Sequence, residues 1–95
     1  MYARLVTFRV APGHRKEMER LADESRRYME MAHGYRRSEF FSNERAHEYG
    51  ALSVWDSLKD IDRATSTLDP RLHEVLKGIS EAPPVIHTYE VYEEA

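Results

Sequence analysis

A run of alternating β-type residues that ends in a tryptophan and passes directly into a helix start constrains this chain more than any other stretch. Residues 47–55 read as a strand that ends at Trp55. Ser57 can cap a helix, and Asp60, three residues later, completes an acidic version of the capping box. We expect a side chain as large as that of Trp55, at a strand end, either to seal the end of a core or to wall a cavity.

The remaining patterns predict four strands and two helical regions. Runs of β-forming residues bounded by turn residues are typical of strands and occur at residues 2–10, 35–43, 47–55 and 85–92. Apolar residues that recur every three or four positions are typical of amphipathic helices and occur at residues 14–33 and 58–68. Gly34 is expected to stop the first helix. Asp69 and Pro70 are expected to restart the second, with a kink near Pro70.

This β-α-β-β-α-β order predicts an α+β fold of the ferredoxin-like βαββαβ type, a four-stranded antiparallel sheet with both helices on one face. The chain length favours a single domain over residues 1–95. Both parities of the strands are apolar: in the first strand, Val6 and Phe8 lie on one side and Ala3 and Leu5 on the other. We therefore expect the open sheet face to pack against a second copy, giving a homodimer whose two sheets enclose an aromatic-lined cavity.

Charge and composition exclude several functions. The net charge is −3 and the basic residues are scattered among acidic ones, so nucleic acid is not an expected partner. The sequence shows neither a signal-peptide pattern nor an apolar run long enough to cross a membrane, so no membrane is expected as a partner. The absence of cysteine suits a reducing compartment, and we expect a cytoplasmic protein. The acidic tail, residues 90–94, is expected to extend the last strand or to fray.

The sequence contains no motif for a metal or a nucleotide cofactor. No two of the five histidines have the i, i+4 spacing of a helical metal site. The chain also lacks a glycine-rich phosphate loop, and only four glycines are present to build one. We therefore expect neither a metal site nor a cofactor.

Three short motifs stand at the boundaries of the predicted elements. They are the Pro12-Gly13 turn that opens the long helix, Gly34-Tyr35 at the start of the second strand, and Val54-Trp55-Asp56-Ser57 before the second helix. Together with the element order, they resemble the antibiotic-biosynthesis monooxygenase family of dimeric α+β barrels, over essentially the whole chain. The resemblance implies a cofactor-independent monooxygenase that oxidises a small aromatic or quinol substrate with dioxygen. In such a site a phenol is deprotonated and its anion reduces dioxygen inside a dry aromatic pocket.

The resemblance and the strand parities suggest site residues. Trp55 matches the tryptophan of the family's box, so its indole could stack on a substrate and donate a hydrogen bond. Tyr49 has the same parity and could donate to a phenolate or fill the dimer interface. His87 stands in an apolar strand, which disfavours its charged form, and is the candidate base; a structural histidine is the alternative. The candidate substrate-binding residues are Phe8, Val6, Tyr89 and Ala51.

Arg4 and Arg9 fall on opposite parities of the first strand. At most one of them can therefore face the cavity, and either could pair with an acidic residue across the dimer.

Alternatives to the monooxygenase stay open. A non-catalytic homodimer could bind a small hydrophobic ligand, or the aromatic cavity could be packed shut. Haem-degrading relatives carry a histidine late in the second helical region, and His73 stands in roughly that place. However, the asparagine in strand one and the second tryptophan in helix two that those relatives carry are both missing. Haem degradation is disfavoured, and weak haem binding through His73 stays open.

Overall fold

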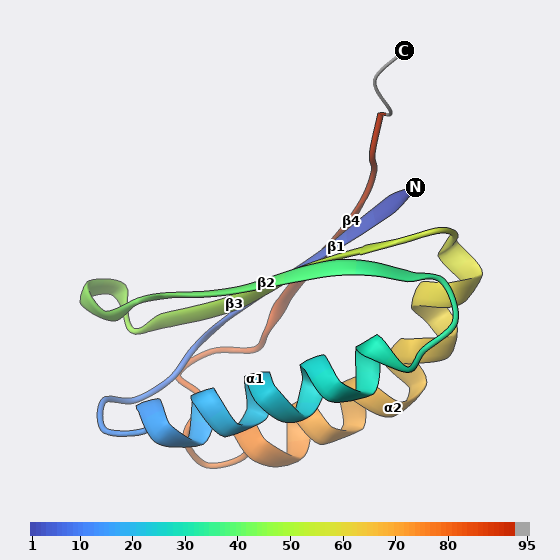
Figure 1. The fold of residues 1–95 in the computed structure, drawn as a ribbon. Coiled ribbons are helices and arrows are strands. Elements are labelled where there is room, and N and C mark those ends of the chain that lie inside the picture. Colours follow the sequence, from blue (N-terminus) through green and yellow to red (C-terminus); the bar gives the residue numbers. More distant parts are fainter. Residues whose placement is uncertain (93–95) are drawn as a thin grey trace.

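Four strands and two helices follow one another in the predicted β-α-β-β-α-β order (Figure 1). This computed structural model describes residues 1–92, so the end of the acidic tail lies outside the described residues. The elements are β1 (Tyr2–Arg9), α1 (Arg15–Glu30), β2 (Tyr35–Asn43), the 3₁₀ helix η1 (Glu44–Ala46), β3 (Glu48–Trp55), α2 (Leu58–Leu76) and β4 (Val85–Glu90). The α+β, ferredoxin-like fold class is confirmed.

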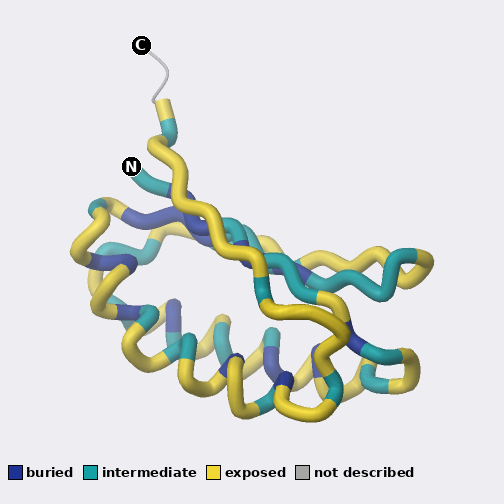
Figure 2. Tube along the Cα trace, turned by 180° about the vertical axis from the view of Figure 1, so that it is seen from behind, coloured by how far each residue is buried: buried dark blue, intermediate teal, exposed yellow. Residues whose placement is uncertain are grey.

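The sheet has the strand order β2-β3-β1-β4, and every neighbouring pair is antiparallel. Helices α1 and α2 lie side by side across one face of this sheet, and no helix of residues 1–92 lies on the other face (Figure 1). Strand β4 forms an edge and is exposed along its whole length (Figure 2). The two central strands, β1 and β3, therefore hold the residues that are best placed to form a site under the helices.

The register shows which side chains face the helices. Residues directly opposite each other in an antiparallel pair point to the same face. Phe8 lies opposite Tyr49, and Val6 lies opposite Ala51. Val6 packs in one core cluster with Leu21 of α1, so this parity is the one that the helices cover.

The other parity of the central strands lies on the open face. Leu5 is opposite His87, and Ala3 is opposite Tyr89. Several large apolar side chains on this face or at its edge are exposed: Phe41 at 42%, Val85 at 51%, Ile86 at 43% and Tyr89 at 50%. Apolar side chains thus lie on both faces of the sheet, and residues 1–92 leave the open face without a covering helix. Its cover by a second copy stays a prediction.

The core consists of two clusters under the sheet. The first joins β1 to both helices and contains Val6, Val10, Met18, Leu21, Leu72 and Leu76. The second lies at the Trp55 end of the sheet and contains Met29, Trp55, Ile61 and Ala64. In each cluster, side chains from one central strand meet side chains from both helices, which fixes both helices against the sheet.

The start of α2 follows the predicted capping pattern. The Ser57 hydroxyl accepts a hydrogen bond from the backbone N–H of Asp60 and donates one to the Asp60 carboxylate. Asp60 Oδ1 also accepts a hydrogen bond from His33 Nδ1 at 2.7 Å. These hydrogen bonds, the one from His33 first, hold the pKa of Asp60 below its ordinary value of 3.8.

The second helical region differs from its prediction, because α2 is one helix over Leu58–Leu76 and Pro70 lies inside it. Proline cannot donate a backbone hydrogen bond, so one bond of the helix is missing. Leu72 and Leu76, beyond the proline, are buried in the first core cluster. Their burial outweighs the local preference of Asp69 and Pro70 for a new helix start.

Neither helix of the described chain has the long apolar stretch needed to cross a membrane.

Candidate functional site

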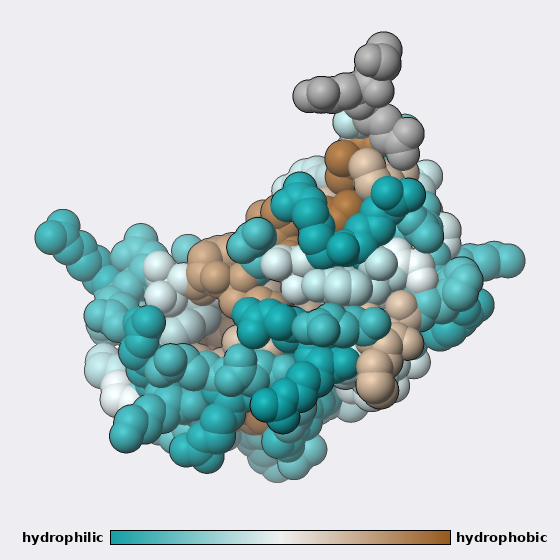
Figure 3. Space-filling model, in the orientation of Figure 1, coloured by the Kyte–Doolittle hydropathy of each residue, from teal (hydrophilic) through white to brown (hydrophobic). Residues whose placement is uncertain are grey.

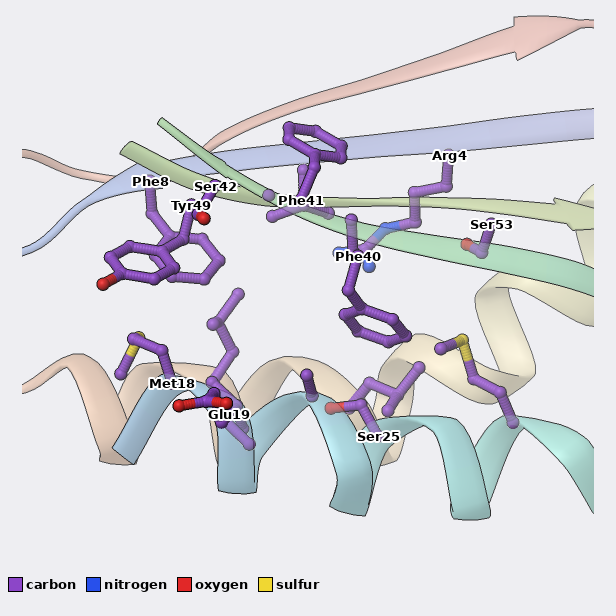
Figure 4. A pocket seen from close by; sticks show the side chains of 18 of the residues that line it. Arg4, Phe8, Met18, Glu19, Ser25, Phe40, Phe41, Ser42, Tyr49 and Ser53 are labelled. Carbon is purple, nitrogen blue, oxygen red and sulfur yellow. The ribbon is translucent and has the colours of Figure 1, made fainter. Parts of the chain in front are cut away.

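A pocket of about 290 Å³ lies between the sheet and the helices (Figure 4). Strands β1, β2 and β3 form its roof, and α1 and α2 form its floor. Hydrophobic side chains are visible between the sheet and α1 in the space-filling view, framed by hydrophilic ones (Figure 3). The apolar lining residues are Val6, Phe8, Met18, Leu21, Ala22, Met29, Phe40, Phe41, Ala51, Leu68 and Leu72, with the phenol ring of Tyr49. A lining of this kind suits a small aromatic ligand.

One end of the pocket is aromatic. The rings of Phe8 and Tyr49 are stacked, with centroids 6.3 Å apart and an interplanar angle of 15°. They lie opposite each other on β1 and β3, so the strand register itself holds them together. The Tyr49 hydroxyl forms no side-chain hydrogen bond within residues 1–92, and the pocket that the residue lines is where a ligand could receive one.

Consecutive phenylalanines of β2 point to opposite faces of the sheet. The Phe40 ring projects between the sheet and α1 (Figure 4), and the Arg26 guanidinium lies over it, 4.9 Å from its centroid. Phe41 also belongs to the pocket lining, but its ring projects to the other side of the sheet (Figure 4). The ring lies so close to Gly50 that a Cβ at that glycine would be 2.4 Å from it. Phe40 is therefore the β2 aromatic of the pocket interior.

Arg4 brings a positive charge into this largely apolar pocket. Its side chain comes from the helix-facing parity of β1, and the residue is only 8% exposed. Its Nη2 atom donates to Asp69 Oδ1 of α2 at 2.6 Å, and both residues line the pocket. Of the two arginines weighed in the sequence, Arg4 is thus the one that faces the cavity, and its acidic partner belongs to the same chain.

Trp55 lies in the core beside the pocket. It is 1% exposed, and its indole N–H donates to the Ser53 hydroxyl at 2.9 Å. Tyr35 packs edge-on against the indole, with centroids 5.5 Å apart. Trp55 does not line the pocket, although Ser53 does. The indole N–H is already hydrogen-bonded. Of the two roles that the sequence allowed for Trp55, the structure therefore supports sealing the end of the core rather than walling a cavity.

The structure separates the predicted site residues into two groups. Tyr49, Val6, Phe8 and Ala51 line the pocket together. His87 and Tyr89 lie on the open face, with their rings 6.0 Å apart, and do not line it. Grouping His87 and Tyr89 with Tyr49 in one cavity is therefore wrong, because the sheet lies between them. A cavity enclosed by two copies of the chain stays a prediction.

Sequence reasoning missed the most polar part of the site. Arg4 was considered as one of two arginines that could face the cavity, without its partner, and Asp69 only as a helix cap. Phe40 and Ser25 of α1 also line the pocket and were not singled out. A signal for Arg4 was present, because it is a charged residue on a parity that is otherwise apolar, between Tyr2 and Val6.

The described residues hold no group of three or more His, Cys, Asp or Glu side chains suited to a metal ion. His73 is exposed on α2 and is not among the pocket residues. This position gives no support to haem binding through His73.

Comparison with known families identifies the group to which this fold and pocket belong. The family model described as antibiotic biosynthesis monooxygenase matches residues 1–71, from β1 into the second half of α2. The chain belongs to the antibiotic biosynthesis monooxygenase family. A search among proteins of curated function finds no match.

Solved structures share the fold of this antibiotic biosynthesis monooxygenase family member at low sequence identity. Rv0793 from Mycobacterium tuberculosis has a TM-score of 0.82 at 15% identity, covering 99% of this chain and 97% of its own. SnoaB from Streptomyces nogalater, a cofactor-independent oxygenase, has a TM-score of 0.75 at 14% identity, covering 98% and 95%. NE2512 from Nitrosomonas europaea, a protein of unknown function, has a TM-score of 0.83 at 12% identity, covering 99% and 91%. At such identities the likeness establishes the fold alone.

Proposed function

We propose that this protein is a cofactor-independent monooxygenase that oxidises a small aromatic or quinol substrate with dioxygen. The observation that carries the proposal is the pocket of about 290 Å³ with aromatic walls, a free tyrosine hydroxyl and a nearly buried arginine. The family, and the structural similarity to the cofactor-independent oxygenase SnoaB, support the same chemistry.

In the proposed reaction, the substrate itself is the reductant. A phenol or enol loses its proton, and the anion transfers an electron to dioxygen. The resulting radical pair joins at a ring carbon that carries hydrogen, forming a C–O bond and a hydroperoxide. Loss of water then leaves a carbonyl, so one oxygen atom stays in the quinone product and the other leaves as water. The apolar walls keep bulk water away from the charged intermediates.

Four of the predicted site residues keep a role in this proposal. Phe8, Val6 and Ala51 would contact the ring system of the substrate, and the Tyr49 hydroxyl would donate to its oxygen. His87 is not included, because it lies on the other face of the sheet. Proton removal is assigned to solvent in contact with the exposed carboxylate of Glu19, which is one of the lining residues.

Oxygen-electrode assays with anthrone and with a hydroquinone test the proposal. We expect oxygen consumption above the rate without protein, and one labelled oxygen atom in the product when ¹⁸O₂ is used. Ala51→Leu should fill the pocket and stop turnover, and Tyr49→Phe should slow it. Tyr92→Phe is the matched control, because Tyr92 is 88% exposed and does not line the pocket. Oxygen consumption no faster than without protein, for both substrates, would contradict the proposal.

Non-catalytic binding of a small hydrophobic ligand is the second candidate. It is favoured by one observation: among the described residues that line the pocket, none is a histidine that could serve as a base. In that case planar aromatics would bind and Ala51→Leu would abolish binding, with no oxygen consumed.

We also propose that the open sheet face packs against a second copy of this chain. The exposed Phe41, Val85 and Tyr89 support this, because apolar side chains gathered on one face of a small domain are typical of an interface. Gel filtration should give a dimer, and Tyr89→Glu should give a monomer. A cytoplasmic location stays a prediction that rests on the cysteine-free sequence.

A further inference from the structure

We propose that Arg4 makes the pocket selective for planar aromatic ligands that carry an ionised oxygen, a phenolate or an enolate, over neutral aromatics of the same shape. This names the substrate class of the proposed monooxygenase and so rests on that function. The structural basis of the proposal is one charged group. The guanidinium of Arg4 is almost removed from water and faces an apolar cavity.

The guanidinium of Arg4 has donors to spare. Its Nη2 atom donates to Asp69, and no second side-chain partner is found within residues 1–92. No side-chain nitrogen or oxygen atom of the described chain is fully buried without a hydrogen-bond partner. The other N–H groups of Arg4 must therefore reach open space, and the pocket that Arg4 lines supplies it. Arginine has five such donors in a planar fork, which suits an oxygen anion.

The other polar groups of the pocket differ from Arg4 in charge or exposure. The hydroxyls of Ser25, Ser42, Ser53 and Tyr49 are neutral donors, and that of Ser53, directly opposite Arg4 in the register, already accepts the indole N–H of Trp55. Arg15, the other arginine of the lining, has a side chain that is 53% exposed and is paired with Glu44 and Glu19. Solvent screens that group, whereas Arg4 acts in a poorly hydrated environment where its field is stronger.

Asp69 sets the strength of the effect. One oxygen of Asp69 accepts from Nη2 of Arg4, so the positive charge of Arg4 is compensated only on that side. The side chain of Asp69 is itself 32% exposed. An anion in the pocket would meet a cation that is fixed in place before the ligand arrives, which costs no reorganisation on binding. The other titratable groups that line the pocket are Arg15, Glu19 and Tyr49, and Glu19, with an exposed side chain, is the one that opposes an anion.

Two matched probes test the inference by absorbance titration: 2-hydroxyanthraquinone, whose spectrum reports its ionisation, and its 2-methoxy analogue, which cannot ionise. The wild-type protein should bind the ionised hydroxy probe more tightly than the methoxy probe and lower the pKa of its hydroxyl. Arg4→Met should weaken binding of the ionised probe about 10- to 100-fold, the range expected for a hydrogen bond to a charged group. It should change binding of the methoxy probe by less than about twofold.

Asp69→Asn separates recognition from structure, because it frees the positive charge while keeping an acceptor for Arg4. It should tighten binding of the ionised probe, and Arg4→Lys should keep part of the preference. Arg36→Met, which breaks an exposed ion pair with Asp56 outside the pocket, is the control and should change nothing. If circular dichroism shows that Arg4→Met does not fold, the two other variants still test the inference. Asp69→Asn should tighten binding of the ionised probe, and Arg4→Lys should keep only part of the preference for it.

Equal weakening of both probes by Arg4→Met, or no tightening by Asp69→Asn, would overturn the inference. The two levels of the proposal fail separately. A charge-dependent probe preference without oxygen consumption from any substrate would remove the monooxygenase and keep the ligand class. Oxygen consumption at the same rate in the wild type and Arg4→Met would keep the monooxygenase and remove the role of Arg4 in selecting the ligand.

Discussion

Replacing Gly34 with alanine should destabilise the protein through a contact that the structure locates at one carboxylate. Gly34 has φ +82°, and a Cβ built on it would lie 2.1 Å from Oδ2 and 2.2 Å from Cγ of Asp60. No carboxylate can stay at that distance. Asp60 must therefore move away from Ser57 and His33, which now hold it at the start of α2.

The expected cost has two parts. A non-glycine residue in the left-handed region costs roughly 1–2 kcal/mol. Disturbing the Ser57 cap adds about 1 kcal/mol, and up to about 2 kcal/mol. Gly78→Ala isolates the first part, because Gly78 has φ +83° and nothing within 4 Å of its Cβ position. We therefore expect Gly34→Ala to lower the free energy of unfolding by about 2–4 kcal/mol, against about 1–2 kcal/mol for Gly78→Ala.

Urea unfolding measures both variants, with Trp55 fluorescence and circular dichroism as independent probes. Trp55 is the only tryptophan, so its signal has a single origin. In an Asp60→Ala background the carboxylate is absent but the Cβ at position 60 stays 2.8 Å from the added Cβ. The extra cost of Gly34→Ala over Gly78→Ala should therefore shrink without vanishing. Equal destabilisation by Gly34→Ala and Gly78→Ala in the wild-type background would refute the reasoning, because it would show that the contact with Asp60 contributes nothing.

Three further predictions follow from local contacts. Ser53→Ala removes the acceptor of the Trp55 indole N–H and should cost about 1–3 kcal/mol in urea unfolding, the penalty of an unsatisfied buried donor; an unchanged midpoint would contradict this. Asp60→Asn should flatten the loss of stability in acid, because the pKa of Asp60 is lowered in the folded state, so its stabilisation is present above pH 3.8 and disappears as the pH falls through the lowered value; parallel pH profiles for variant and wild type would count against it. Gly50→Ala places a Cβ 2.4 Å from the Phe41 ring and 2.8 Å from a backbone oxygen, so it should cost about 1–3 kcal/mol, and adding Phe41→Ala should relieve only the ring contact.

The strands and their alternation were predictable from the sequence, because a period of two residues is a local property. Tyr49 and Trp55 were correctly placed on one parity, as were Val6 and Phe8. The cap at Ser57 was predictable for the same reason, since its partner Asp60 is only three residues away. These features need no knowledge of how distant parts of the chain meet.

The side of the sheet on which the helices pack was not predictable in the same way. Both parities of β1 and β3 are apolar, so alternation alone does not tell the covered face from the open one. His87 was therefore grouped with Tyr49, although the two residues lie on opposite faces of the sheet. The antiparallel register of β1 with β4 resolves this, because it puts His87 opposite Leu5, on the parity away from the helices.

Long-range pairing explains the two other differences. The partner of Arg4 is 65 residues away, so nothing near Arg4 in the sequence indicates Asp69. In α2, Pro70 favours a break locally, but the helix continues because Leu72 and Leu76 are buried beyond it. In both cases tertiary packing decides what local preference leaves open.

The alternation of β1 divides its residues between two separate tasks. Even positions, such as Arg4 and Phe8, meet whatever enters the pocket, while odd positions, such as Ala3 and Leu5, belong to the opposite surface. Point substitutions at even positions can therefore alter ligand preference during evolution without changing the outer surface. Substitutions at odd positions can change that surface without altering ligand preference. A deletion of one residue in β1 would exchange the two sets at once, turning the buried charge outward. We conclude that β1 tolerates substitutions but almost no insertion or deletion.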